Sequence, residues 1–179
     1  MRKNSFKSHI KYFHLNIDFQ THAFFKQLDW VMIQTKLEKI KWSYQIDLHA
    51  LVMMDSHLHL LISSHQQKEN FFTDHIKHEL KININQETYS EPISNHAQYL
   101  NTYKYIYRNP VEAGLCQTVE AYTFSSLHFI MGRSVPYCQV TDQLGLVQNP
   151  FHILSWLNSS KNYKISQLKS LRQDNSFSI

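Results

Sequence analysis

The sequence contains very little glycine and proline, with 3 glycines and 4 prolines in 179 residues. Collagen-like chains and flexible linkers need far more of both residues. Phosphate-binding loops of nucleotide enzymes place several glycines close together, and this chain has no such cluster. The composition therefore excludes these classes.

Cysteine is equally scarce. The two cysteines, Cys116 and Cys138, are far apart and form no Cys-x-x-Cys pair. This pattern argues against a disulfide framework and against a thiolate zinc site. No apolar run approaches the roughly 18 residues of a membrane span, and no apolar signal core follows the basic N-terminus. We therefore expect a soluble, cytoplasmic protein without a membrane partner.

Hydrophobic residues make up 42% of the chain and charged residues 18%, so the chain can bury a core. The length corresponds to one domain, with room for a terminal extension. The formal net charge of +4 permits a polyanionic partner without requiring one.

Hydrophobic periodicity predicts alternating strands and helices. Two-residue alternation favours three strands, and apolar residues at helical spacing favour two helices between and after them. A short edge strand and a third helix follow. The predicted segments are strand 11–19, helix 22–42 with Thr21 as its N-cap, strand 44–54, a turn at Asp55-Ser56, strand 57–63, helix 66–81 and edge strand 91–93. This order indicates an α+β fold in which helices pack on an antiparallel sheet.

The third predicted helix begins after Ser94 or Asn95, which can cap it, and runs to about Arg108. Pro110 suggests a bend or a restart, and Gly114 a C-terminal stop. After Phe124 the pattern predicts short helices and loops, including one helix near residues 150–157.

His57 and His59 are two positions apart on a predicted strand, so both imidazoles point to the same face. Two neutral imidazoles on one face are a natural beginning for a divalent metal site. The pair alone is a weak signal, because 12 histidines in this length give about 0.8 such pairs by chance.

A tyrosine-rich helix carries the second candidate group. On a helix, Tyr105 and Asn109 stand at i and i+4 on one face, whereas Tyr107 lies about 200° from Asn109. If Asn109 completes a metal site, Tyr105 is therefore the tyrosine that shares it. A tyrosine hydroxyl beside a metal-held phosphate is a nucleophile that can form a phosphotyrosine ester. The alternative is that these tyrosines have only a structural role and pack on the sheet.

Taken together, these motifs resemble those of the single-tyrosine HUH transposases, and most closely the REP-associated tyrosine transposases. The matching stretches are His57-Leu58-His59 with Leu60-Leu61-Ile62 after it, the segment from Tyr105 through Asn109-Pro110 to Leu115, and Tyr122-Thr123-Phe124-Ser125-Ser126. Their order and spacing agree with the family over roughly residues 8–130. Asp55-Ser56 replaces the usual Pro-Asn turn, and Phe124 replaces a tryptophan.

The resemblance implies a ferredoxin-like (RRM-like) HUH endonuclease fold in residues 1–130, followed by a C-terminal helical extension in residues 131–179. It implies a metal-dependent endonuclease and strand transferase that acts on hairpin-flanked single-stranded DNA during transposition. Tyr105 would attack the scissile phosphate and form a 5′-phosphotyrosine link. His57, His59 and Asn109 would hold Mg²⁺ or Mn²⁺.

Basic residues are candidates for contacts with the DNA backbone. We predict this role for Lys11, which follows a basic arm, for Lys77 on the second helix and for Arg108 beside Asn109. Ordinary solvated side chains are the alternative.

Two other functions remain open. The first is a domesticated protein that binds DNA hairpins without cutting them. The second is a metal hydrolase in which His57 and His59 activate a water molecule, which would leave a free 5′-phosphate and no protein adduct. The sequence also leaves open whether the chain acts as a monomer or as a homodimer with shared active sites.

Overall fold

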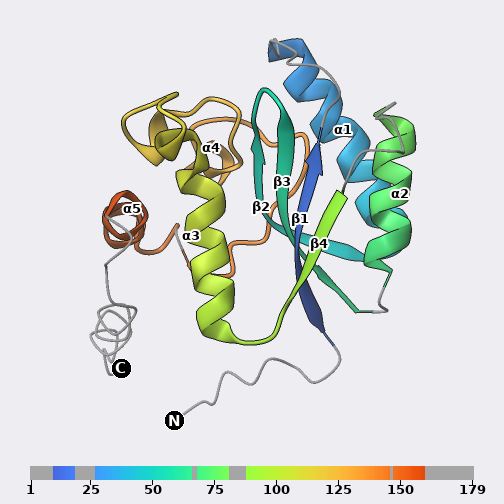
Figure 1. Cartoon of the computed structure of the whole chain (residues 1–179). Helices are drawn as coiled ribbons and strands as arrows, with labels where there is room; N and C mark the ends of the chain where they lie inside the picture. Colours follow the sequence, from blue (N-terminus) through green and yellow to red (C-terminus); the bar gives the residue numbers. More distant parts are fainter. Residues whose placement is uncertain (1–9, 19–26, 66–67, 81–87, 146, 160–179) are drawn as a thin grey trace, which may run out of the picture.

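A computed structural model describes residues 10–18, 27–65, 68–80, 88–145 and 147–159. Its four strands are β1 (Lys11–Asp18), β2 (Ile46–Met53), β3 (His57–Ser64) and β4 (Thr88–Ile93). They form one sheet in the order β2-β3-β1-β4 with every neighbouring pair antiparallel (Figure 1). The expected α+β fold with helices on an antiparallel sheet is therefore confirmed.

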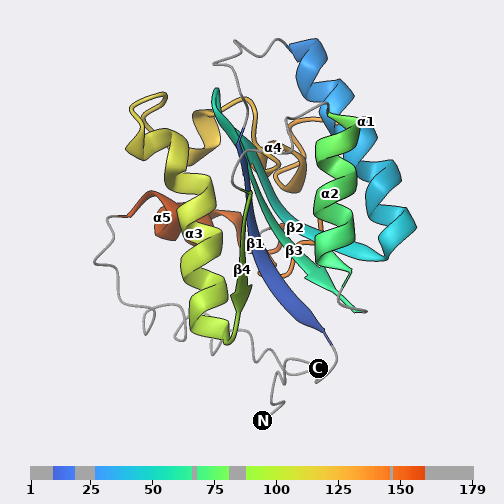
Figure 2. The same ribbon diagram turned by 45° about the vertical axis from the view of Figure 1, so that its right-hand side comes forward.

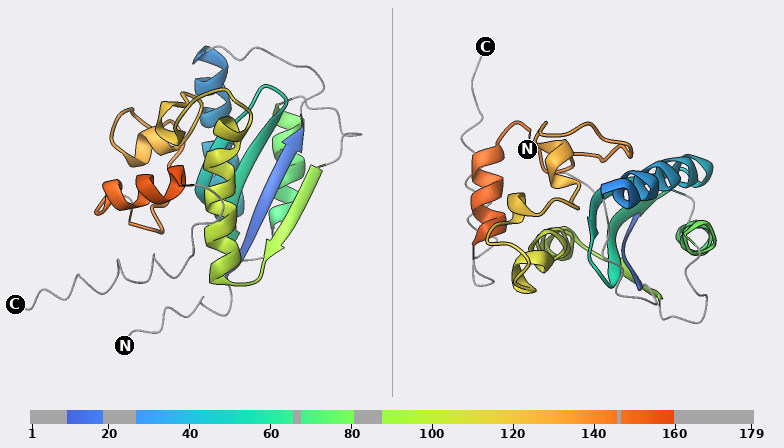
Figure 3. Two further views of the ribbon diagram at one scale, coloured as in Figure 1. Left: turned by 60° about the vertical axis from the view of Figure 1, so that its left-hand side comes forward. Right: turned by 90° about the horizontal axis from the view of Figure 1, so that it is seen from above.

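The two faces of the sheet are covered by different helices. Helices α1 (Gln27–Tyr44) and α2 (Glu69–Glu79) lie on one face, and α3 (His96–Glu112) lies on the other (Figures 2 and 3). Strand alternation explains this division. In β1, for example, Leu15 belongs to the core beneath α1 and α2, whereas Tyr12 belongs to the core beneath α3.

The predicted boundaries shift where the chain leaves a helix. The strand expected from residue 44 begins at Ile46, because α1 continues through Tyr44 and Gln45 then turns with a φ of 55°. Helix α2 is shorter than the segment 66–81, whereas β4 extends the short edge strand 91–93 toward its N-terminus. The proposed cap Thr21 lies outside the described residues.

Helix α3 has the expected start and a longer end. The Asn95 side chain accepts a hydrogen bond from the Gln98 backbone N–H at 2.9 Å, which caps the helix. The helix continues through Pro110 to Glu112, because a proline in the last turn removes only one backbone hydrogen bond. Gly114 follows with a φ of 73°, a conformation that favours glycine and ends the helix.

The chain after α3 packs back onto the domain. It contains a 3₁₀ turn η1 (Val119–Ala121) and the helices α4 (Leu127–Ile130) and α5 (Pro150–Asn158), in line with the expected short helices. Trp156 of α5 is buried in the core beneath α3, and Cys138 is buried in the core beneath α1. The domain boundary at residue 130 stays a prediction. None of the described helices is long and apolar enough to cross a membrane.

Candidate functional site

The histidine pair lies at the beginning of β3, on the face that α3 covers in part. His57 is directly opposite Asp18 of β1, and His59 is opposite Asn16. The two imidazole rings are nearly perpendicular, with their centroids 4.5 Å apart. Strand alternation puts both rings on the same face of the sheet. Figure 1 shows that β3 begins at the end of the sheet where the final turns of α3 lie.

Helix α3 presents one of its tyrosines to this pair. Tyr105 is 49% exposed, and its ring meets the His59 ring edge-on with 5.5 Å between centroids. By contrast, Tyr103 and Tyr107 are each only 1% exposed, and burial raises the pKa of both hydroxyls. Among these three tyrosines, Tyr105 alone has an open ring next to a histidine.

His59 is the most enclosed member of the site, with an exposed fraction of 1%. Its Nε2 lies 2.6 Å from the Asn109 amide nitrogen, and its Nδ1 lies 3.2 Å from Nε2 of His14. Burial, together with the neighbouring His57 and His14, lowers the pKa of His59 to about 3. The ring is therefore neutral at physiological pH, which a metal ligand or a hydrogen-bond acceptor requires.

His57 has different partners. Its Nδ1 lies 2.8 Å from the Ser56 hydroxyl, in the turn that precedes β3. Burial lowers the pKa of His57, while the carboxylate of Asp18 acts in the opposite direction. Since Ser56 engages Nδ1, the Nε2 atom is the one left for a ligand.

Three further side chains were not among the residues that the sequence suggested. Ser56 appeared only as a turn residue, and His14 and Asn16 only as members of a strand. The Oδ1 atom of Asn16 is buried and has no hydrogen-bond partner within the described ranges. The proximity of His14 and Asn16 to His59 depends on the β1–β3 register, which a single sequence does not reveal. The alternation of His14, Asn16 and Asp18 on one face of the strand was the available signal.

A polar joint fixes α3 against the sheet. The Tyr107 hydroxyl and the Ser126 Oγ are 2.8 Å apart, and the same Oγ accepts a hydrogen bond from the backbone N–H of Leu51 at 2.9 Å. Ser125 forms a bridge to Val52 of β2. The serine pair after Phe124 therefore connects β2 to the helix that carries Tyr105.

The three basic residues predicted to contact DNA lie apart from this group. Lys11 is at the other end of β1, seven residues from Asp18, or about 23 Å along the strand. Lys77 is on α2, which covers the opposite face of the sheet (Figure 3). Their contacts with DNA stay predictions.

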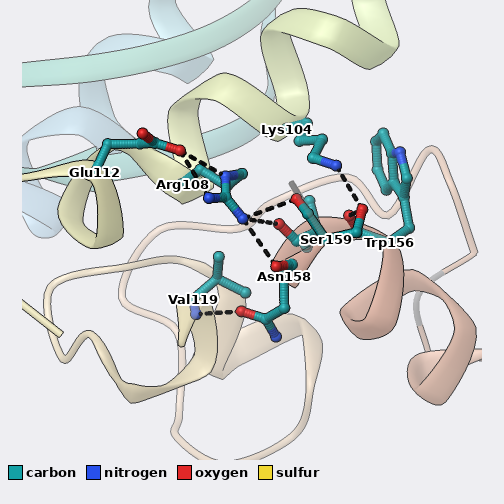
Figure 4. A network of polar contacts seen from close by, with 8 residues as sticks. Lys104, Arg108, Glu112, Val119, Trp156, Asn158 and Ser159 are labelled. Atoms are coloured by element: carbon teal, nitrogen blue, oxygen red, sulfur yellow. Dashed lines mark hydrogen bonds and ion pairs between the residues drawn. The ribbon is translucent and has the colours of Figure 1, made fainter. Parts of the chain in front are cut away.

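Arg108 is next to Asn109 in sequence, yet its guanidinium group turns to α5 (Figure 4). Its Nη1 donates to the carbonyl oxygens of Leu157, Asn158 and Ser159 at 3.2, 2.9 and 2.9 Å. Its Nη2 and Nε donate to the Glu112 carboxylate at 2.7 and 3.0 Å. A structural role for Arg108 thus accompanies the predicted DNA contact, which stays a prediction.

Three side chains of this group carry atoms of the kinds that bind divalent cations. His57 and His59 offer neutral nitrogens, and the Asn109 amide offers an oxygen to a cation of this class. Within the described ranges, no group of three or more His, Cys, Asp or Glu side chains is placed to hold a metal. A site here would therefore depend on the Asn109 amide as the third donor.

The fold is similar to that of a solved transposase. A structure described as the REP-associated tyrosine transposase bound to a REP hairpin superposes with a TM-score of 0.55 at 19% sequence identity. The match covers 74% of this chain and 86% of the transposase chain. No protein-family model matches the sequence, and no curated protein matches it either. The resemblance noted in the motifs thus extends to the fold.

Proposed function

We propose that this protein is a metal-dependent single-stranded DNA endonuclease and strand transferase that forms a 5′-phosphotyrosine intermediate at hairpin-flanked sites. The observation that carries the proposal is the exposed Tyr105 ring against His59, in a site that also contains His57 and Asn109. The similar fold of a transposase whose structure holds a REP hairpin supports the choice of DNA as substrate.

In the proposed reaction, the Tyr105 Oη attacks the scissile phosphorus of the DNA strand. A bond forms between Oη and phosphorus, and the bond between phosphorus and the 3′-oxygen breaks. The tyrosine gives up its proton, and the leaving 3′-oxygen gains one. Attack by another 3′-hydroxyl on the phosphotyrosine reverses the step and joins new strands, so no nucleotide energy source is needed.

His57, His59 and Asn109 would hold Mg²⁺ or Mn²⁺ beside the phosphate. The cation would polarise the non-bridging phosphate oxygens and stabilise the charge that develops on them. The residues of the chain supply orientation: burial keeps His59 neutral, and Ser56 holds His57 by its Nδ1. Because the Tyr107–Ser126 joint fixes α3, Tyr105 stays next to the pair.

We also propose that one chain is sufficient for the reaction. Tyr105 faces the histidine pair of its own chain, so no second copy is needed to deliver the nucleophile. A mixture of a Tyr105→Phe chain and a His59→Ala chain should therefore form no adduct. Adduct formation in that mixture would indicate shared sites in a homodimer.

The direct test uses a labelled single-stranded hairpin DNA from the flanks of the protein's own gene, Mn²⁺ and a denaturing gel. We expect the label to migrate with the wild-type protein and not with Tyr105→Phe. The matched control is Tyr137→Phe, because Tyr137 is also exposed (53%) but lies outside the site. An adduct with Tyr105→Phe would contradict the assignment.

One contact favours a second candidate, a hairpin-binding protein that does not cut DNA. The Asn109 amide nitrogen already lies 2.6 Å from the Nε2 that a metal would use. In that case the DNA should shift equally with and without metal, and it should stay intact. A free 5′-phosphate product without adduct would instead indicate a metal hydrolase that activates water.

A further inference from the structure

His14 of β1 is buried against the histidine pair and has no role in the function proposed above. Its exposed fraction is 7%, and its ring lies close to the plane of the His59 ring, with a tilt of 27° and 5.3 Å between centroids. The two rings also share a hydrogen bond of 3.2 Å between His14 Nε2 and His59 Nδ1. The ring of Tyr105 lies edge-on to both, 5.7 Å from His14 and 5.5 Å from His59.

The contacts on the two sides of His59 indicate which of its ring nitrogens carries the hydrogen. The Asn109 amide nitrogen is only a donor, so the Nε2 of His59, 2.6 Å away, must accept. A neutral imidazole that accepts at Nε2 carries its hydrogen on Nδ1. With this tautomer, the contact to Nε2 of His14 has His59 as the donor, and a neutral His14 that accepts at Nε2 carries its own hydrogen on Nδ1.

We propose that His14 is a positioning residue, which holds His59 in the Nδ1-protonated tautomer and turns the Nε2 lone pair of His59 toward Asn109 and the open site. This inference rests on the proposed function in one respect only, namely that the ligand of this lone pair is a metal ion. When one ring nitrogen of a histidine binds a metal, an acceptor for the hydrogen on the other ring nitrogen fixes the tautomer and the ring orientation and raises the basicity of the ligand nitrogen. In most such sites a carboxylate or a backbone carbonyl fills this role, and here an imidazole does.

The tautomer of His59 can be determined in the protein alone, without metal and without DNA. Long-range ¹H–¹⁵N NMR spectra distinguish a protonated Nδ1 from a protonated Nε2 in each histidine ring. In the metal-free wild type, we expect His59 to carry its hydrogen on Nδ1. A hydrogen on Nε2 of His59 would overturn the proposal at once.

Three substitutions separate the hydrogen bond from the packing. His14→Phe keeps a buried ring against His59 and Tyr105 but removes the acceptor. His14→Gln places an amide oxygen at about the distance of the lost Nε2, whereas His14→Asn is too short to reach. Without the acceptor, the Asn109 amide can turn its oxygen toward an Nε2–H, so we expect a mixture of His59 tautomers in the Phe and Asn variants. The Gln variant should keep the wild-type tautomer.

Mn²⁺ affinity, measured by calorimetry on the DNA-free protein, provides the second measurement. Loss of the acceptor should weaken binding roughly 10- to 100-fold in the Phe and Asn variants. The Gln variant should stay within about 3-fold of wild type, since it restores the acceptor. Thermal unfolding of all three variants checks that each remains folded.

The outcomes separate this inference from the proposed function. Unchanged tautomer and unchanged affinity in both His14→Phe and His14→Asn would overturn the role of His14. So would an equal loss in all three variants, because it would indicate a packing role alone. A wild-type protein that binds no Mn²⁺ and forms no adduct would overturn the proposed function, while the tautomer measurement would still decide the role of His14.

Discussion

The guanidinium group of Arg108 fixes the end of α5 against α3, and removing it tests whether this contact stabilises the fold. The last carbonyl groups of a helix lack partners within the helix and lie at the negative end of its dipole. Arg108 supplies these partners to α5 through Nη1, and its side chain is only 14% exposed. The substitution Arg108→Met keeps the aliphatic stem and removes every one of these hydrogen bonds.

The expected cost follows from the contacts. A hydrogen bond that involves a charged group contributes about 1.5 kcal/mol or more to stability. Because one Nη1 serves three carbonyl groups, we count two such bonds and expect a loss of about 3 kcal/mol. For a chain of this size, this loss corresponds to a fall in Tm of roughly 6–12 °C.

The assay is urea unfolding followed by circular dichroism, with Glu112→Gln as the matched control. Glu112 is 42% exposed, so its ion pair with Arg108 should contribute less than about 1 kcal/mol. A free energy of unfolding for Arg108→Met within about 0.5 kcal/mol of wild type would refute the reasoning. Binding of hairpin DNA at several salt concentrations tests the other role, since loss of a phosphate contact would reduce the salt slope by about 0.7.

Two more predictions concern buried polar groups outside the candidate site. Burial lowers the pKa of His49 in the folded protein to about 4, whereas the pKa in the unfolded chain is 6.5. Between these two pH values only the unfolded chain binds a proton at His49, so the free energy of unfolding decreases as the pH falls. At pH 5 this loss should be about 2 kcal/mol relative to pH 8, and urea unfolding of His49→Gln should show a correspondingly smaller loss; an identical pH profile would contradict the shift. Ser126→Ala should lower the free energy of unfolding by about 1–3 kcal/mol, because it removes the hydrogen bonds of Ser126 Oγ to the Tyr107 hydroxyl and to the Leu51 N–H. Ser134→Ala, at an exposed position, is the matched control, and equal Tm values for the two variants would argue against the joint.

The elements of the fold were accessible from the sequence because each has a local signal. Alternation defined β1 and β3, and the Asn95 cap and Gly114 defined the two ends of α3 to within a few residues. Boundaries failed where a tertiary contact extends or ends an element. Helix α3 passes Pro110, for example, since this proline is buried and costs only one hydrogen bond.

The surroundings of His59 were not accessible in the same way. His14 is 45 positions away in the sequence, and its place beside His59 depends on which strands pair and in which register. The apolar alternation of β1 fixes the face on which His14 lies, but nothing local to β1 determines which residue of β3 lies beside it. The direction of Arg108 likewise depends on where α5 packs, and α5 begins 42 positions later.

The geometry of the site depends on side chains that never touch a ligand. Tyr103 and Tyr107 are buried against the core, so they fix the rotation of α3 about its axis. That rotation leaves Tyr105 exposed and brings Asn109 to His59, since the two residues are four apart. Residues two apart on a helix point in nearly opposite directions. The burial of the flanking tyrosines and the exposure of Tyr105 therefore both depend on the rotation of α3 about its axis. Any change that breaks the contact between Tyr107 and Ser126 should also move Tyr105 away from the histidine pair.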